Sequence, residues 1–86
     1  MDAVRLTVEG MELDFAMARG LAQALAAADN PETMLIAWGD RAKGTHSPCC
    51  VKCQFGDKPG WEVYGENHGG RLRIDINHGA YVLIYS

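Results

Sequence analysis

Hydrophobic and polar side chains alternate along several short stretches of the chain. Near the N-terminus, Val4, Leu6 and Val8 alternate with Arg5 and Thr7, and a period of two is typical of a strand with one buried face. Other stretches alternate in the same way or are continuous apolar runs between turn residues. The pattern predicts strands over residues 3–8, 33–38, 61–64, 72–76 and 81–85.

One longer stretch has the spacing of a helix. Asp14 is a good N-cap, and Asn30-Pro31 ends the pattern because proline disfavours helical geometry in the residue before it. Between them, apolar residues recur every three or four positions, at Phe15, Ala18, Leu21, Ala22, Leu25 and Ala28. The sequence predicts a single helix from about 14 to 28.

The predicted elements follow the order β-α-β-β-β-β. Residues 77–79 form a turn-rich link that favours an antiparallel hairpin between the last two strands, and the apolar run 33–38 is expected at the middle of the sheet. A single helix can cover only one face of a sheet. We therefore expect an α+β fold, a two-layer sandwich in which the helix packs on a mostly antiparallel sheet.

The other face of this sheet is expected to be polar and solvated. Its expected side chains are Arg5, Arg71, Arg73 and Asp75. A small domain with an uncovered sheet face can also associate through it. This favours the hypothesis of a homodimer, or of a protein partner, bound at the open face.

Composition narrows the classes of function. The 86 residues fit one domain, spanning 1–86, and 48% hydrophobic with 22% charged residues is ordinary for a folded protein. A net charge of -3 has the wrong sign for a nucleic-acid binder. The start of the chain lacks a signal-peptide pattern, and no apolar run approaches the roughly 20 residues of a membrane span. We expect a cytoplasmic protein that binds neither nucleic acid nor membranes.

Residues 39–60 have no convincing periodicity and read as a long loop. Within it, HSPCCVKC at 46–53 contains all three cysteines of the chain. A loop of this length in a compact domain is usually functional or disordered. The loop is therefore the first place to look for chemistry.

Zinc, or another thiophilic metal, is the leading specific hypothesis for this loop. Cys50 and Cys53 have the two-residue spacing that grips one tetrahedral ion, and bound metal would stabilise the fold. The expected ligands are Cys50 and Cys53, then Cys49 or His46, with His46, His68 or His78 as the fourth. Strong zinc signatures, however, carry two separated pairs, whereas these thiols form one cluster.

Two alternatives stay open for the cysteines. In a non-enzymatic interaction module they would be reduced, structural residues that behave as small hydrophobic side chains. In a thiol-redox protein Cys50 and Cys53 would form a dithiol, with Lys52 and Arg41 favouring the thiolate. A redox dithiol usually begins a helix, which the residues after Cys53 do not resemble.

Two further groups of residues are candidates for a site. Trp38 and Trp61 are expected near the long loop, where they would line a small ligand pocket together. Proton transfer is a weaker hypothesis, because acidic and histidine residues are common in turns and no nucleophile can be identified. Its candidates are Asp57, Glu62, Glu66 and His68. An enzyme is thus not the favoured interpretation.

The segments SPCCVKC and GDKPGWEVYGENHGGRLRIDIN, together with the closing YVLIYS, carry a family resemblance. They resemble a family of short bacterial and archaeal proteins classed as a domain of unknown function. The resemblance covers nearly the whole chain and is densest from His46 to Ser86. It implies a small standalone prokaryotic domain, and it supplies no activity or site residues to carry over.

Overall fold

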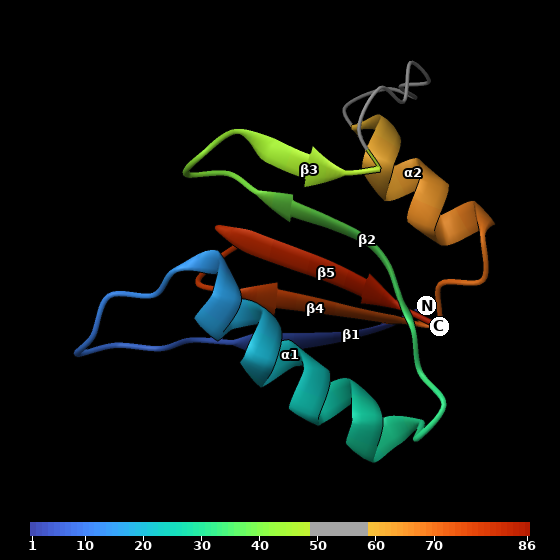
Figure 1. Ribbon diagram of the computed structural model, residues 1–86, viewed down its shortest axis with the longest axis horizontal. Coiled ribbons are helices and arrows are strands. Elements are labelled where there is room, and N and C mark those ends of the chain that lie inside the picture. The colour runs from blue at the N-terminus through green and yellow to red at the C-terminus, as the bar shows by residue number, and fades with distance from the viewer. Residues whose placement is uncertain (49–58) are drawn as a thin grey trace.

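The structure is a computed structural model that describes residues 1–48 and 59–86. It contains one five-stranded sheet and two helices (Figure 1). The elements are β1 (Asp2–Leu6), α1 (Phe15–Asp29), β2 (Leu35–Asp40), β3 (Thr45–Ser47), α2 (Gly60–Asn67), β4 (Leu72–Ile76) and β5 (Tyr81–Tyr85). No helix in the described ranges is both long enough and apolar enough to span a bilayer.

The strands are ordered β1-β4-β5-β2-β3 across the sheet. Only β1 and β4 pair in parallel, and the other three pairs are antiparallel. The predicted α+β class, the mostly antiparallel sheet and the hairpin of the last two strands are confirmed. The apolar run predicted as a central strand forms β2, which lies inside the sheet between β5 and β3.

Helix α1 packs on one face of the sheet, which we call the α1 face. The side chain of Asp14 caps it by accepting a hydrogen bond from the Met17 N–H at 2.8 Å. Its buried side is made of Ala18, Ala22 and Ala26, all fully buried. Because alanine is small, the helix axis can lie close to the sheet. The predicted helix is confirmed, with ends within one residue of the expected ones.

The α1 face holds most of the core. Side chains at alternate positions of β4 and β5 pack beneath the helix, since successive residues of a strand point to opposite faces. They are Leu72, Ile74, Ile76, Tyr81, Leu83 and Tyr85.

Helix α2 packs on the opposite, second face of the sheet. A Cβ placed on Gly65 would lie 2.8 Å from Ile84 Cδ1 and 3.2 Å from Ala37 Cβ, so the helix backbone rests directly on these strands. Residues 61–64 are therefore helical, and their prediction as a strand was wrong. The expectation of only one helix is corrected with it: α2 covers part of the second face.

The stretch expected as one long loop begins with strand structure. Strand β2 continues to Asp40, and the chain turns back at Gly44, where φ is +65°. The short strand β3 then pairs antiparallel with β2. A strand of three residues is too short to produce a visible period in the sequence.

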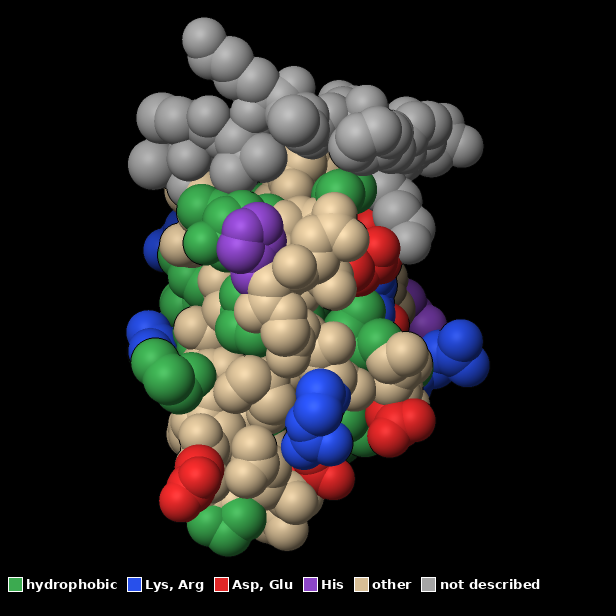
Figure 2. All heavy atoms as spheres, turned by 90° about the vertical axis from the view of Figure 1, so that its right-hand side faces the viewer, with side chains coloured by type: hydrophobic (Ala, Val, Ile, Leu, Met, Phe, Trp, Pro, Cys, Tyr) green, Lys and Arg blue, Asp and Glu red, His purple; other side chains and the backbone are tan. Residues whose placement is uncertain are grey.

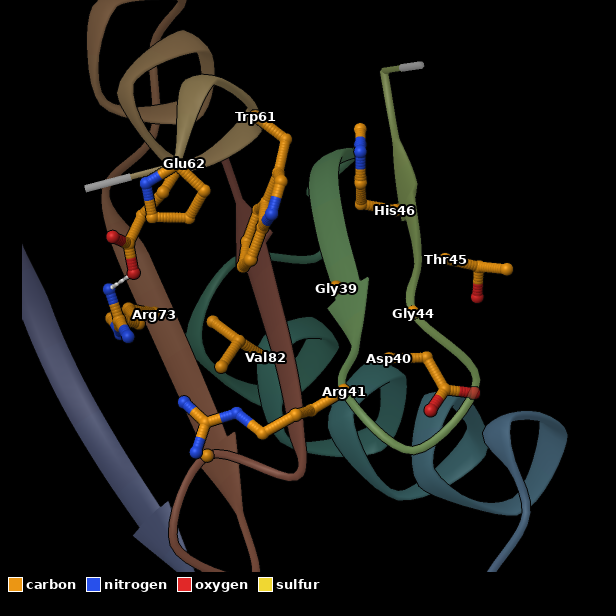
Figure 3. Close-up of a pocket in the computed structure, with 12 residues that line it drawn as sticks. Gly39, Asp40, Arg41, Gly44, Thr45, His46, Trp61, Glu62, Arg73 and Val82 are labelled. Carbon is orange, nitrogen blue, oxygen red and sulfur yellow. Dashed lines mark hydrogen bonds and ion pairs between the residues drawn. The ribbon is translucent and has the colours of Figure 1, made fainter. Parts of the chain in front are cut away.

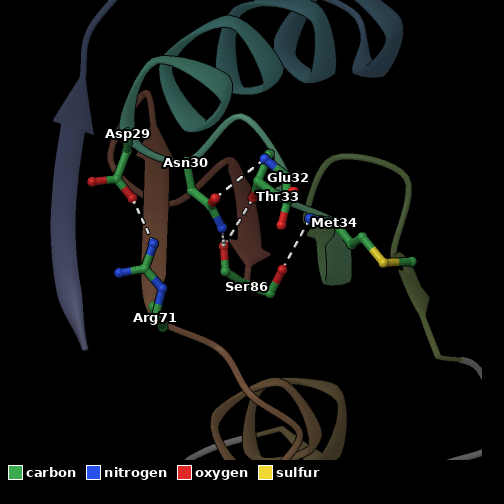
Figure 4. Close-up of polar contacts among 7 residues, drawn as sticks. All are labelled: Asp29, Asn30, Glu32, Thr33, Met34, Arg71 and Ser86. Carbon is green, nitrogen blue, oxygen red and sulfur yellow. Dashed lines mark hydrogen bonds and ion pairs between the residues drawn. The ribbon is translucent and has the colours of Figure 1, made fainter.

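Polar contacts fasten the connection between α1 and β2 to the last residue of the chain (Figure 4). The Ser86 carbonyl oxygen accepts hydrogen bonds from Asn30 Nδ2 at 3.3 Å and from Thr33 Oγ1 at 3.0 Å. The Met34 N–H donates to Ser86 Oγ at 3.0 Å. These contacts hold the start of β2 in register beside β5.

Candidate functional site

One residue from each strand contributes to a row across the second face of the sheet. Partners that lie opposite each other in neighbouring strands point to the same face. The row, from β1 to β3, is Arg5, Asp75, Val82, Gly39 and His46. Its ends are polar and large, whereas its middle, at Val82 and Gly39, is small. The small residues therefore leave space above the centre of the row.

A hollow of about 450 Å³ lies over this centre, between α2 and the turn that joins β4 to β5 (Figure 3). An adjoining hollow of about 380 Å³ lies toward β1 and shares Arg41, Arg73 and Gly79 with it. Both volumes fall in the range of pockets that bind small molecules. The hollows exist because α2 covers only one part of the second face.

Trp61 forms one wall of the larger hollow. A Cβ on Gly39 would lie 2.8 Å from Trp61 Cη2, so the indole rests on the backbone of β2 where a side chain is missing. Figure 3 shows His46 beside the indole, on the next strand. Two planar rings therefore flank this end of the hollow.

Arg73 is shared by two acidic groups at the edge of the hollow. Its guanidinium forms an ion pair with Glu62 of α2 and another, at 3.2 Å, with Asp75 of its own strand. Glu62 is almost fully buried, and such a carboxylate requires a cationic partner. The Arg73 contacts also tie α2 to β4.

Arg41 has no such compensation. Its side chain extends past Val82 toward the β4–β5 turn (Figure 3), and a Cβ on Gly79 would lie 3.6 Å from its Nη2 atom. Within residues 1–48 and 59–86, no carboxylate pairs with this guanidinium. The neighbouring Asp40 points away and accepts a hydrogen bond from the Lys43 N–H at 3.3 Å. The hollow thus contains an exposed cation that no carboxylate of residues 1–48 and 59–86 pairs with.

The predicted cysteine ligands Cys49, Cys50 and Cys53 lie outside the described residues. Among the residues that are described, no three His, Cys, Asp or Glu side chains gather closely enough to hold a metal ion.

The three histidines come from different places in the fold. His46 is exposed on β3, and its Nδ1 lies 3.1 Å from the Pro48 carbonyl oxygen. His68 follows the C-terminal end of α2, stacked on Tyr64 with ring centroids 3.8 Å apart and Nδ1 2.8 Å from the Tyr64 carbonyl oxygen. His78 lies in the β4–β5 turn.

The two tryptophans do not share a pocket, so that prediction was wrong. Trp38 lies on the α1 face, where its ring centroid is 4.3 Å from that of Phe15. Trp61 lies over Gly39 on the second face. Residues 38 and 39 are consecutive in β2 and therefore point to opposite faces. Only Trp61 lines the hollow.

Among the described residues, the structure does not bring together the side chains that the acid/base hypothesis requires. Asp57 lies outside the described residues. Glu62 is bound to Arg73, and His68 is occupied with Tyr64 at the far end of α2.

Sequence reasoning missed the roles of Gly39, Arg41 and Arg73. The alternation in β4 placed Arg73 on the polar face, but its partner Glu62 was assigned to a strand. The significance of Gly39 depends on which helix covers it. The significance of Arg41 is that no carboxylate of the described residues pairs with it, and a sequence does not show this. Strand pairing and the position of α2 were needed to find this site.

The comparisons with known proteins bear on identity. A family comparison matches residues 1–85 to a domain of unknown function, DUF5619. The chain belongs to the DUF5619 family. The predicted resemblance to a domain of unknown function is therefore confirmed, and the DUF5619 match spans the elements that build the hollow. A search of curated proteins found no match.

A solved structure supports the fold of this DUF5619 domain. The chain is similar to the protein AF1514 from Archeoglobus fulgidus, for which a crystal structure is known. The two sequences are 27% identical. The match covers 100% of this chain and 93% of that chain, with a TM-score of 0.80. This similarity to an archaeal protein supports a small prokaryotic domain. The description of AF1514 names no activity.

Proposed function

We propose that this domain binds a small anionic molecule in the hollow on the second face of the sheet. The observation that carries the proposal is the guanidinium of Arg41, which lies across the hollow and has no carboxylate partner among the described residues, whereas Glu62 and Asp75 are held by Arg73. A guanidinium offers a planar fork of donors that fits a carboxylate or a phosphate. Trp61 and His46 supply flat walls for the rest of the ligand.

The distribution of charge supports the same proposal. The chain has a net charge of -3, whereas the lining of the two hollows is balanced, with three of the five arginines and three carboxylates, those of Asp40, Glu62 and Asp75. On the side of the molecule seen in Figure 2, charges of both signs are scattered over the described atoms. Arginines gathered in a concave region attract anions more strongly than the same charges dispersed on a convex surface.

The two tryptophans provide the test. In a ¹⁵N NMR titration with inorganic phosphate or citrate, the Trp61 indole N–H resonance should shift. The Trp38 resonance, on the opposite face, should stay in place. A Trp61→Phe variant assigns the two signals. Unmoved Trp61 signals up to about 10 mM of either anion, a concentration at which even millimolar affinity is visible, would exclude the proposal.

Arg41→Gln should weaken anion binding about tenfold or more, because a charge-assisted hydrogen bond is lost. The matched control is Arg71→Gln, which removes an exposed arginine that pairs with Asp29 outside the hollow. Equal affinity of the two variants would contradict the role of Arg41.

As a second candidate we propose that Cys50 and Cys53, with Cys49 or His46, bind a zinc-like metal. One observation favours His46. A carbonyl oxygen can only accept, so His46 Nδ1 donates to Pro48 and the neutral ring keeps a lone pair on Nε2 for a metal.

Metal analysis of freshly purified protein tests this candidate. A Cys50→Ser, Cys53→Ser double variant and a His46→Ala variant should lose bound metal, whereas His78→Ala should retain it. Three free thiols on titration would instead favour reduced, structural cysteines. Reversible loss of two thiols on mild oxidation would favour a dithiol.

A further inference from the structure

The two adjoining hollows on the second face form one trough with chemically different ends. The end over Gly39 is lined by Trp61 and His46. The end toward β1 is lined by Arg5 and by His78 of the β4–β5 turn. Arg41 lines both hollows. A molecule that fills the trough therefore needs a flat, weakly polar end and an anionic end.

Charge is concentrated at the second end. The smaller hollow is lined by three arginines, Arg5, Arg41 and Arg73, and by one carboxylate, that of Asp75. Asp75 already pairs with Arg73 at 3.2 Å. Within the described part of the chain, Arg5 and Arg41 have no carboxylate partner. Two guanidinium groups are thus left to bind an anion.

The strand register gives the length of the ligand. Gly39, beneath Trp61, and Arg5 belong to the same row and are separated by three strand spacings. At about 4.8 Å for each spacing, the two positions are roughly 14 Å apart. Arg41 and Arg5 both line the smaller hollow, so an aromatic ring joined to a phosphate by a sugar-sized spacer fits this distance.

From this arrangement we infer that the ligand is a nucleotide-sized molecule, with an aromatic ring beside Trp61, its first phosphate at Arg41 and any second phosphate at Arg5. The inference rests on the proposed binding of an anion in the hollow and adds the class of ligand. Arg41 binds the first phosphate and Arg5 the second, and the ring lies against the indole and the His46 imidazole, as bases do on aromatic side chains. The net charge of -3 disfavours binding of a nucleic-acid strand, so the ligand we infer is a free nucleotide.

Four compounds test the inference by calorimetry or by the Trp61 indole resonance. They are AMP, ADP, ribose 5-phosphate, which lacks the ring, and adenosine, which lacks the phosphate. AMP should bind at least about tenfold more tightly than either ribose 5-phosphate or adenosine, in keeping with the contribution of one stacked base. ADP should bind more tightly than AMP, because its second phosphate reaches Arg5.

Variants of the exposed Arg5 and of the half-buried Trp61 separate the two ends. Arg5→Gln should remove the advantage of ADP over AMP, whereas Arg19→Gln, an exposed arginine of α1, should leave both affinities unchanged. Trp61→Phe should reduce the advantage of AMP over ribose 5-phosphate severalfold while leaving ribose 5-phosphate binding intact.

The outcomes distinguish the inference from the function on which it rests. If ribose 5-phosphate binds as tightly as AMP, the hollow binds anions but the ligand class inferred here is wrong. If adenosine binds and none of the phosphates does better, both are wrong. If Arg5→Gln weakens AMP and ADP equally, the assignment of the second end is overturned.

Discussion

At position 39 the absence of a side chain decides what the second face of the sheet can hold. The Trp61 indole occupies the space that a Cβ would fill. Beside the indole, the hollow stays open over the small side chain of Val82. One glycine therefore seats α2 and shapes the candidate site.

Gly39→Ala should destabilise the protein by about 1 to 3 kcal/mol, because the new methyl group displaces a packed indole. Gly20→Ala is the matched control, since its Cβ would meet open space and alanine favours the helix by up to about 1 kcal/mol. Urea denaturation of both variants measures the difference. Combining Gly39→Ala with Trp61→Ala should remove most of the extra cost of the alanine.

Tyr85 is fully buried, and its hydroxyl has no hydrogen-bond partner among the described residues. Burial raises the pKa of the Tyr85 phenol, and the Arg19 guanidinium offsets a smaller part of this. Below about pH 10, the ordinary pKa of tyrosine, the phenol is neutral in both folded and unfolded chains, so its contribution is constant. Above that pH only the unfolded chain ionises readily, and stability falls as pH rises.

Tyr85→Phe should therefore flatten the loss of stability above about pH 10, the ordinary tyrosine pKa. At neutral pH the variant should be as stable as the wild type or more stable, because an unsatisfied buried hydroxyl is removed. Denaturant titrations at several pH values check both. An unchanged alkaline slope would show that Tyr85 does not contribute. Tyr81 would then be the remaining buried phenol, whose pKa burial and the Asp40 carboxylate raise.

Among the elements, the sequence revealed those whose period reflects one buried face. Helix α1 and strands β1 and β4 follow this rule, whereas β5 is buried at every position and was predicted from its continuous apolar run. Helix α2 was mistaken for a strand because Trp61, Val63 and Tyr64 favour strands and no helical stripe is visible in eight residues. Its stability comes from tertiary contacts, namely Gly65 against the sheet and Glu62 with Arg73. A local pattern cannot report such contacts.

The ion pairs of Arg73 join α2 to β4, so their loss should affect both elements. Arg73→Ala should cost about 2 to 3 kcal/mol, since it leaves Glu62 buried without a cation. Asp75→Ala should cost less, because the Arg73–Glu62 pair remains.

Arg71→Ala provides the control for Arg73→Ala. It breaks an ion pair with Asp29 in which both side chains are about half exposed, and such pairs contribute about 0 to 1 kcal/mol. Thermal and urea denaturation compare the three variants. Equal losses for Arg71→Ala and Arg73→Ala would argue against a structural role for the Glu62 pair.

Across the whole molecule, the sheet separates a core from a candidate site. The α1 face contains the packed interior, and the second face carries α2 and the hollows. The sequence predicted the polar side chains that β1 and β4 place on the second face. It did not predict that α2 buries Ala37 and Ile84 on the same face, so the expectation of a wholly polar, solvated face was wrong. The homodimer predicted through this face stays a prediction.

This separation can be tested by a variant on the α1 face. Ala22→Leu should destabilise the fold by about 1 to 3 kcal/mol through overpacking against the sheet. The affinity for AMP should not change, because Ala22 lies on the far side from Arg41. Denaturation and calorimetry on the same preparation measure both. A large loss of affinity in the still-folded variant would mean that the two faces are coupled.

The hydrogen bonds at Arg71 have a consequence for protein engineering. The Asp2 N–H donates to the Arg71 carbonyl oxygen at 2.9 Å, and the Arg71 N–H donates to the Tyr85 carbonyl oxygen at 2.9 Å. The first and last strands therefore flank the same residue, and both chain ends lie on one side of the molecule (Figure 1). A flexible linker of about four to six residues spans the two strand spacings between them, roughly 10 Å. The domain is thus suited to circular permutation, with new ends opened in the exposed turn at Gly10.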